Sequence, residues 1–311
     1  MYKKRLIILL SLIAVLALLY TGSLIYYSDM GRQSSFAWID SRAAERINRI
    51  VVSTEWEEFE LARNDNRWLI IHNGNEFPAR QVRVEDFMNI LTQRAAWSVR
   101  STSASTHERF GLAGSASRIT VYGGNQTLLD LLLGGDDSIG NEIYFRKYGQ
   151  NEVRSGDGSI KAYLSNLTGW YNLRLIPDSE GGNIDAGSVQ RLTVVNGEET
   201  QVFQRRNRGW IISGMEVANP SHNSIENYIR TLINAEGDRF SDNVSFSDLN
   251  AGRIILEFGN GRIVTIRLGE PDETGRRDAH VSGSGMDNYI YSIPSWGANR
   301  LFRDAESFEM L

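Results

Sequence analysis

The sequence predicts an α+β protein with an N-terminal transmembrane helix followed by two tandem repeats of a mostly antiparallel sheet with packed helices. Three observations predict it: an uncharged apolar run near the start, alternating apolar and polar residues, and the recurrence of one pattern in both halves. Alternation with a period of two is typical of strands that bury one face. Short connections cannot join parallel strands, so we expect antiparallel pairing.

The first 28 residues are predicted to be a cytoplasmic tip and a membrane anchor. Residues 6–27 carry no charge, and a helix of that length, about 33 Å, crosses a hydrocarbon core. Lys3, Lys4 and Arg5 precede it, which favours an N-terminus inside and the bulk of the chain outside the cytoplasmic membrane, in a single-pass topology. A cleaved signal peptide is the alternative, but its apolar region is shorter and YTGSL is a poor cleavage site.

Composition excludes several classes of function. The chain has no cysteine, which excludes thiol catalysis, disulfides and thiolate metal sites. All 38 acidic residues and 30 of the 33 basic ones follow residue 28, so the exported part carries a formal charge of −8. Such a surface does not attract nucleic acid. We therefore expect no nucleic-acid partner, and contact with the lipid bilayer through residues 6–27.

The exported part divides into two segments of similar length. Residues 29–46 form a polar tether, and residues 47–176 form the first α+β repeat. The linker, residues 177–188, is rich in glycine and acidic residues, which is typical of a boundary. Residues 189–311 form the second α+β repeat, and each repeat has the size of an ordinary domain.

The repeat is visible when one segment is slid over the other by 142 positions. Seven identities then fall within about 47 residues, where chance gives roughly three. They pair Arg49, Val52, Glu57, Arg63, Trp68, Ile70 and Pro78 with Arg191, Val194, Glu199, Arg205, Trp210, Ile212 and Pro220. We expect Trp68, Pro78, Trp210 and Pro220 to hold equivalent structural positions, the tryptophans anchoring sheet to helix rather than stacking on sugars.

The elements of each copy follow in one order. Two alternating runs precede the tryptophan and predict two strands, with a third beginning at Trp68 or Trp210. A helix follows the proline: residues 224–233 carry one apolar stripe opened by an N-cap serine. The stripe residues are Ile225, Tyr228, Ile229, Leu232 and Ile233, with Val84, Phe87, Ile90 and Leu91 in the first copy.

A four-stranded meander completes each copy. Residues 117–137 match residues 252–272 at a shorter offset, as strand, glycine turn and strand. Residues 142–155 then match residues 279–293, a hairpin in each case. A terminal helix is predicted after the first hairpin, with Ile160, Tyr163, Leu164 and Leu167 on one face.

No motif for catalysis, nucleotide binding or zinc binding is present. The four histidines form no metal-binding pair and are interpreted as solvated or capping residues; they are His72, His107, His222 and His280. The acidic loop 134–142 contains Asp136, Asp137, Asn141 and Glu142 but lacks the ligand spacing of a calcium loop. We interpret it as a variable hairpin loop, and predict no metal site and no cofactor.

Three glutamates raise the question of paired catalytic carboxylates. Glu57, Glu58 and Glu60 lie in one predicted strand, where Glu58 and Glu60 alternate with apolar residues. Such alternation favours the solvent face of a sheet over two acids facing each other across a cleft. We predict no catalytic residue and no enzymatic activity. An enzyme would need acids that converge in a pocket from distant segments.

Two other tryptophans are candidates for contact with a partner. Trp56 lies beside acidic residues and has no aromatic counterpart in the second copy, where Glu198 takes its place. Trp38 lies in the tether near the predicted membrane surface.

Residues 108–156 contain a set of turn and strand motifs. They are the turn Phe110, Gly111 and Leu112, a strand ending in Leu133 and Gly134, and a strand from Ile143 to Arg146. This pattern resembles the DUF4340 family of bacterial membrane-anchored exported proteins. The resemblance covers the exported part in two copies, plus the anchor. The second copy departs from it, since Phe246 to Leu249 replace the turn and Ala279 to Ser282 replace the tyrosine strand.

The resemblance implies a function by association. Members are commonly encoded beside an ABC-transporter ATPase, its permease and a second exported subunit similar to gliding-motility transport proteins. It implies an extracytoplasmic accessory subunit that binds the ABC transporter permease or the second exported subunit, and it assigns no catalytic residues. The alternative is an envelope scaffold or glycan-binding protein without a transporter partner.

Overall fold

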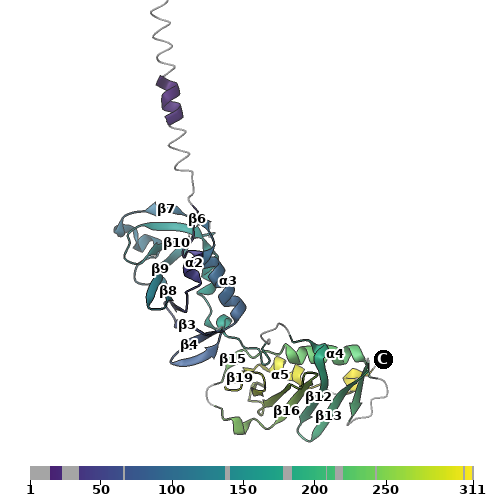
Figure 1. The fold of residues 1–311 in the computed structure, drawn as a ribbon. Coiled ribbons are helices and arrows are strands. Elements are labelled where there is room, and N and C mark those ends of the chain that lie inside the picture. The colour runs from purple at the N-terminus through teal and green to yellow at the C-terminus, as the bar shows by residue number, and fades with distance from the viewer. Residues whose placement is uncertain are drawn as a thin grey trace, which may run out of the picture. The chain divides into compact units, whose positions relative to one another are not determined.

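The computed structural model describes residues 15–22, 35–65, 67–136, 141–177, 184–207, 209–213, 220–241, 244–303 and 305–309. The chain forms two compact units, Met1–Leu167 and Thr168–Leu311 (Figure 1). The second unit begins before the linker predicted at residues 177–188. Leu173, Leu175 and Ile176 are buried in the core of the second unit, so apolar burial rather than composition sets its first residue.

Only part of the predicted membrane anchor is described. Residues 15–22 are helical, and Leu18 and Leu19 are 71% and 65% exposed. Residues 6–14 and 23–27 lie outside the described residues. In the part of the chain that the structure describes, no helix is long and apolar enough to cross a membrane. The anchor therefore remains a prediction from the sequence.

The first unit is built on a nine-stranded antiparallel sheet with the order β5-β4-β3-β2-β8-β9-β10-β11-β7. Its strands are β2 (Arg49–Ser53), β3 (Glu58–Asn64), β4 (Arg67–His72), β5 (Asn75–Pro78), β7 (Ser98–Ser101), β8 (Ser117–Gly123), β9 (Gln126–Asp136), β10 (Glu142–Lys147) and β11 (Val153–Asp157). A separate pair joins β1 (Ser35–Phe36) to β6 (Ala95–Ala96). The helices are α2 (Ser41–Ala44), α3 (Gln81–Thr92) and the 3-10 turns η1 (Ala104–Thr106), η2 (Glu108–Phe110) and η3 (Gly158–Tyr163).

The second unit is built on an eight-stranded antiparallel sheet with the order β14-β13-β12-β16-β17-β18-β19-β15. Its strands are β12 (Val189–Asn196), β13 (Glu199–Arg206), β14 (Gly209–Ser213), β15 (Arg239–Phe240), β16 (Gly252–Phe258), β17 (Ile263–Leu268), β18 (Arg277–Ser282) and β19 (Ile290–Ile293). The helices are α4 (His222–Ile233), α5 (Ser295–Leu301) and the turns η5 (Ala186–Ser188), η6 (Phe246–Asp248) and η7 (Ala305–Phe308); η4 (Leu167–Trp170) spans the boundary between the units.

The two sheets share their strand order once the edge strand β5 is set aside, and they also share their register. Arg49 lies opposite Tyr122, and Arg191 lies opposite Glu257. Arg191 is the counterpart of Arg49 at the offset of 142 positions, and Glu257 is the counterpart of Tyr122 in the match of residues 117–137 with 252–272. Arg63 opposite Trp68, and Arg205 opposite Trp210, repeat the agreement at the other side of the sheet. A mostly antiparallel α+β fold with two sheets is therefore confirmed, and β4, β3, β2 and β8 align residue by residue with β14, β13, β12 and β16. The predicted match of the two hairpins is displaced by about three residues, because Phe145 opposite Leu133 and Ala279 opposite Leu268 hold equivalent positions.

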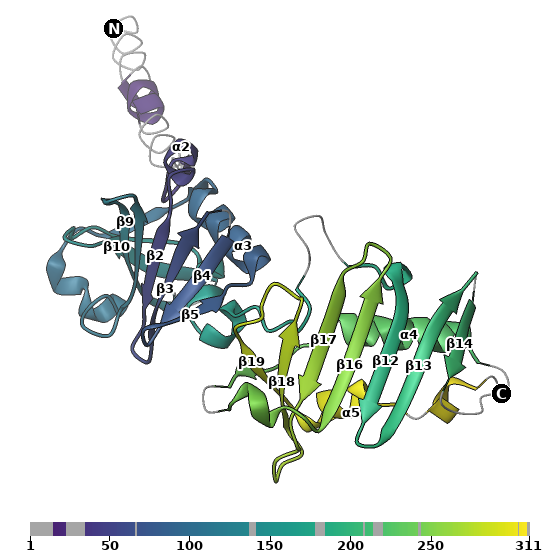
Figure 2. The same ribbon diagram turned by 60° about the horizontal axis from the view of Figure 1, so that its bottom comes forward.

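Helices cover one face of each sheet. In the second unit α4 buries all five residues of its predicted stripe against the sheet (Figure 2). It begins at His222, two residues before the predicted start, because the Ser221 hydroxyl rather than Ser224 accepts the capping hydrogen bond. In α3 the buried residues are Val84, Phe87 and Leu91.

The first unit departs from the predicted elements in small ways. The short strands β5, β6 and β7 were not predicted, since two to four residues are too few to show alternation. The predicted terminal helix is the 3-10 turn η3, which begins where the Asp157 carboxylate accepts a hydrogen bond from the Ser159 N–H.

In both repeats the backbone N–H of the tryptophan bonds to the first side chain of the helix that follows the third strand. The Trp68 N–H donates to Gln81 Oε1 at 2.9 Å, and the Trp210 N–H donates to His222 Nδ1 at 3.0 Å. Gln81 and His222 are the first residues of α3 and α4. Each helix therefore begins with a side chain that satisfies a donor of the strand beside it.

The second copy adds a partly buried polar network around its tryptophan. Trp210 is 3% exposed, and its Nε1 donates to Glu226 Oε1 at 2.9 Å. Arg205 Nη2 donates to the same oxygen at 2.6 Å, with its guanidinium over the indole ring. Trp68 is half-buried. Pro78 is buried in β5, and Pro220 forms a bridge with Glu309.

The turn formed by Phe110, Gly111 and Leu112 meets the end of β9 at unusually close range. A Cβ atom at Gly134 would collide with the Phe110 carbonyl oxygen and would lie 2.9 Å from Leu112 Cγ. Gly111 itself has a φ of +69°, which favours glycine. At the corresponding Gly269 of the second unit, an added Cβ atom would lie 3.2 Å from Leu249 Cδ2, so the contact is looser. The turn at residues 110–112 and the strand end at Gly134 are separate motifs in the sequence, and they contact each other in the structure.

Gly134→Ala is expected to lower the stability of the first unit by about 1–3 kcal/mol, because the added methyl group forces the turn away from β9. Gly114→Ala, in the same segment but with open space around it, should change stability by less than about 0.5 kcal/mol. Thermal unfolding followed by near-UV circular dichroism measures both. Equal effects of the two substitutions would contradict the close contact.

Glu226→Ala is expected to destabilise the second unit by about 1–3 kcal/mol, because it leaves the Trp210 Nε1–H and Arg205 without their shared acceptor. The control is Glu257→Ala, which removes the exposed ion pair with Arg191 at 3.7 Å and should cost less than about 1 kcal/mol. Urea unfolding of the two variants provides the comparison. The network has no such role if Glu257→Ala proves the more damaging change.

Candidate functional site

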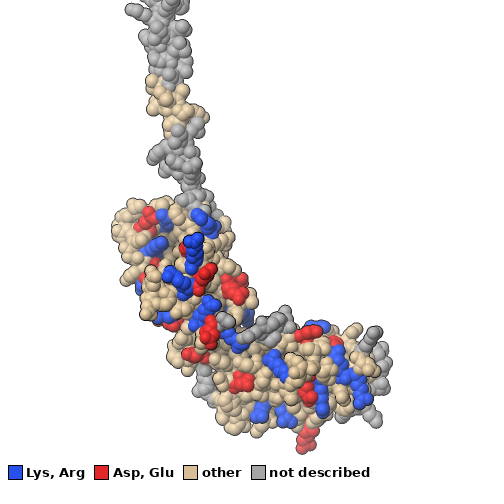
Figure 3. All heavy atoms as spheres, viewed as in Figure 1, with Lys and Arg blue, Asp and Glu red and all other residues tan. Residues whose placement is uncertain are grey.

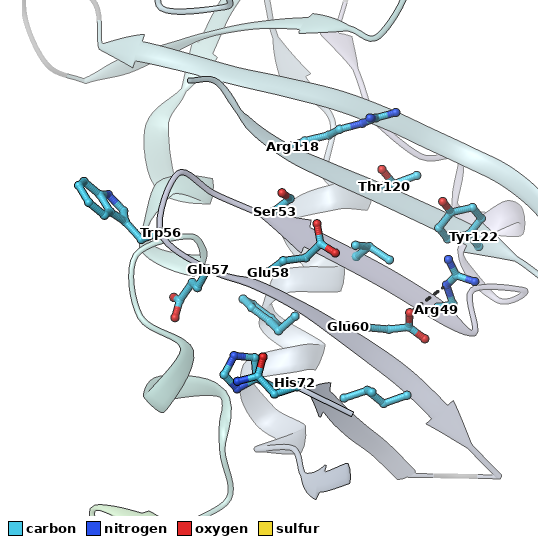
Figure 4. Close-up of a pocket in the computed structure, with 14 residues that line it drawn as sticks. Arg49, Ser53, Trp56, Glu57, Glu58, Glu60, His72, Arg118, Thr120 and Tyr122 are labelled. Atoms are coloured by element: carbon cyan, nitrogen blue, oxygen red, sulfur yellow. Dashed lines mark ion pairs between the residues drawn. The ribbon is translucent and has the colours of Figure 1, made fainter. Parts of the chain in front are cut away.

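The outer face of the first sheet, opposite α3, carries an open groove of about 790 Å³ (Figure 4). Strands β2, β3, β4 and β8 form its floor, and the β2–β3 hairpin closes one end. The labelled side chains come from these elements: Arg49, Ser53, Trp56, Glu57, Glu58, Glu60, His72, Arg118, Thr120 and Tyr122. The groove lies entirely within the first unit.

Alternation along the strands explains which side chains reach the groove. In β2, Ile50 and Val52 are buried, so Val51 and Ser53 point to the outer face. In β3, Glu58 is exposed and Glu60 is half-buried, on either side of buried Phe59. Their position on the solvent face agrees with the alternation in the sequence.

Both arginines of the groove are paired with carboxylates. Arg49 Nε lies 3.3 Å from Glu60 Oε2, and its guanidinium stacks 4.1 Å above the Tyr122 ring. Arg118 donates twice to the Asp130 carboxylate, from Nε at 2.8 Å and from Nη2 at 2.7 Å. This bidentate contact raises the pKa of Arg118. The floor of the groove is therefore a pre-ordered polar surface.

The acidic residues of the hairpin have different surroundings. Glu57 Oε1 accepts a hydrogen bond from the Leu167 N–H at 3.1 Å, so this carboxylate stabilises the fold. Glu58 forms no ion pair within the described residues. Glu60 is held by Arg49. The two acids on the groove floor lie along one strand, on the same face, and not on opposite walls of a cleft.

Trp56 stands at the tip of the β2–β3 hairpin, where 86% of its surface is exposed. The Thr54 hydroxyl oxygen accepts hydrogen bonds from the Trp56 N–H at 3.3 Å and from the Glu57 N–H at 3.1 Å. The tight turn holds the indole beyond the ends of the strands (Figure 4). Such an exposed aromatic ring is a surface for stacking against a ligand or partner.

Trp38 has a different environment from Trp56. Its ring stacks on Trp97 with centroids 5.5 Å apart and meets the edge of Phe145 at 5.6 Å. Phe36 also stacks on Trp97, with ring centroids 5.6 Å apart. Trp38 Nε1 is buried and has no hydrogen-bond partner in the described part of the chain. Trp38 is therefore half-buried in an aromatic cluster that joins the tether to the first sheet.

Three of the four histidines contact backbone groups. His222 Nδ1 accepts from Trp210, His107 Nε2 lies 3.0 Å from the Asn151 carbonyl oxygen, and His280 Nε2 lies 2.8 Å from that of Asp287. His72 borders the groove.

The acidic loop is only partly described, because residues 137–140 lie outside the described residues. Asp136 pairs with Lys161, and Glu142 accepts from Arg100 at 2.8 Å. Within the described ranges no group of three or more histidine, aspartate or glutamate residues is placed to hold a metal ion.

Sequence reasoning missed the pair of Arg118 and Asp130. The two residues are 12 positions apart on neighbouring strands, and only the register of β8 against β9 makes them neighbours. The alternation in residues 117–137 places both on one face, which is the signal that was available. Without the register, that signal does not identify the partner.

The sequence matches the family described as domain of unknown function (DUF4340) over residues 68–255. No curated protein and no solved structure matches the chain. The match begins at Trp68, the anchor of the third strand, and ends within β16 of the second unit, so it includes parts of both sheets. Because it covers more than half of the 311 residues, the chain belongs to the DUF4340 family.

Proposed function

We propose that this protein is a non-catalytic binding subunit, anchored in the cytoplasmic membrane and displayed outside it, that serves an ABC-type transport or envelope system. The open outer face of the sheets carries the proposal. In each unit helices cover one sheet face, and in the first unit the other face holds a pre-ordered polar groove with an exposed tryptophan at its end. Such faces suit recognition of another molecule.

The proposed anchor supports the accessory role. An apolar helix segment whose side chains are largely exposed, such as residues 15–22, finds its apolar partner in lipid. Confinement to the membrane raises the effective concentration near a permease, so modest interfaces suffice. The family's frequent gene neighbours, an ATPase and a permease, supply the energy-coupling parts for which this sequence has no motif.

The surface charge is compatible with binding to proteins. Basic and acidic side chains are interspersed over the visible face of both units (Figure 3). Mixed charge with a modest net excess of acid favours solubility and specific contacts over general attraction to polyanions.

Co-purification of the tagged full-length protein tests this function. Extraction in a mild detergent is expected to recover an ABC permease and its ATPase in constant proportion, because the anchor and the exported units both contact the complex. A chain lacking residues 1–28 should lose most of that recovery, as the effective concentration falls. Recovery of the protein alone, even after crosslinking in intact cells, would overturn the accessory role.

A second function, glycan binding, is favoured by one observation. Trp56 is 86% exposed beside a groove lined by hydroxyl and carboxylate groups. Sugars bind where an aromatic ring covers an apolar face of the pyranose and polar groups meet its hydroxyls. The envelope provides such ligands at the location that we propose.

Trp56→Ala is expected to abolish a change in tryptophan fluorescence that soluble N-acetylglucosamine oligomers produce on binding, because the stacking ring is lost. Trp296→Ala is the matched control, since Trp296 is also 64% exposed but lies in the second unit. No fluorescence change with the wild-type chain, or equal changes in the two variants, would exclude glycan binding at this groove.

A further inference from the structure

The second unit presents two arginines directly opposite each other on its open sheet face. Arg253 in β16 and Arg267 in β17 are cross-strand partners, and both side chains are exposed. Directly opposite residues of an antiparallel pair have Cβ atoms about 5 Å apart, and like charges at that separation are destabilising. Neither arginine forms an ion pair within the described residues. No carboxylate within the described residues therefore offsets the repulsion between these two cations.

The first unit shows how the same position is neutralised. Arg118 corresponds to Arg253 by the offset and register that relate β8 to β16. In the first unit Asp130 binds Arg118 through two hydrogen bonds, and Leu132 lies opposite. In the second unit Thr265 occupies the position of Asp130, and Arg267 occupies that of Leu132. The second copy therefore lacks the internal carboxylate and has a second cation at these positions.

Other carboxylates on this face do not replace the missing one. Glu257 pairs with Arg191 at 3.7 Å. Asp278 lies two residues before His280, which is opposite Arg267, and no ion pair joins Asp278 to Arg267 in the described part of the chain. Within the described residues, therefore, no carboxylate of this face pairs with Arg253 or Arg267.

Aliphatic side chains flank the two arginines on the same face. Val195 lies opposite Arg253, and Ile255 lies opposite Thr265; both are half-buried. Ile263 is 55% exposed further along β17. Arginine next to aliphatic side chains is typical of protein interfaces. A phosphate polymer or a lipid headgroup has no apolar group that would pack against Val195, Ile255 and Ile263.

We propose that Arg253 and Arg267 bind a carboxylate-bearing segment of a partner protein, which lies on the outer face of β12, β16 and β17 (Figure 2). The partner supplies the acid that Asp130 supplies within the first unit. Charge complementarity selects the occupant, because each guanidinium presents a fork of N–H donors that matches the oxygens of a carboxylate. This inference goes beyond the transporter role and does not depend on it.

The test uses the full chain in a non-ionic detergent and poly-L-glutamate as the probe, with affinity measured by calorimetry. The wild type is expected to bind, and the double variant Arg253→Glu/Arg267→Glu to bind about tenfold more weakly or worse. Thr265→Asp restores the internal carboxylate and should weaken binding as well, without loss of thermal stability. That pattern distinguishes competition for the arginines from misfolding.

Matched controls place the same charges on the helix side of the unit. Arg230→Glu/Arg300→Glu changes two exposed arginines of α4 and α5, and Thr231→Asp adds one carboxylate to α4. Both should bind the probe within about twofold of the wild type. The proposal is overturned by a wild type that does not bind, or by controls that weaken as much as the test variants. It is equally overturned if polyphosphate or anionic lipid vesicles bind while poly-L-glutamate does not.

Discussion

The pairing register of the central strand in each sheet is the constraint on which the rest of the structure depends. Because side chains alternate between faces, a slip of one residue would move Ile50 and Val52 of β2 from the core to solvent. Strand β2 pairs with β3 and β8 in a defined register, and β12 pairs with β13 and β16 in the corresponding register of the second unit. The buried face then selects the position of the helix, and the outer face becomes available for binding.

The contacts that hold the helices and turns against the sheets have been kept with different chemistry in the two copies. A glutamine side chain accepts the tryptophan N–H in the first unit, and a histidine ring does so in the second. Phe110 packs on Tyr144 with centroids 4.6 Å apart, and Phe246 packs on His280 at the same separation. The second copy therefore retains aromatic packing of its turn even where its sequence departs from the family pattern. Packing restricts geometry more tightly than it restricts residue type.

The outer faces have diverged further than the cores. In the first unit the bidentate pair of Arg118 and Asp130 and the pair of Arg49 and Glu60 order a polar floor. In the second unit the corresponding surface has two arginines directly opposite each other, and no ion pair joins either to a carboxylate within the described residues. Solvent-facing positions carry little of the folding energy, so they are free to change with the binding partner. The two corresponding sheets thus present outer faces of different chemistry on one chain.

The sequence by itself determined the α+β class, the antiparallel strands, the buried stripe of α4 and the correspondence of the two copies, because these depend on periodicity and short-range spacing. Only the tertiary structure decided which tryptophan is exposed. In the sequence both Trp38 and Trp56 are candidates for an exposed contact, yet contacts with Trp97 and Phe145, distant in the chain, bury much of Trp38. The close approach at Gly134, the pair of Arg118 with Asp130 and the opposition of Arg253 and Arg267 likewise depend on register between strands. Register is set by the burial of a whole sheet face rather than by any single residue, so it is not readable from a local pattern.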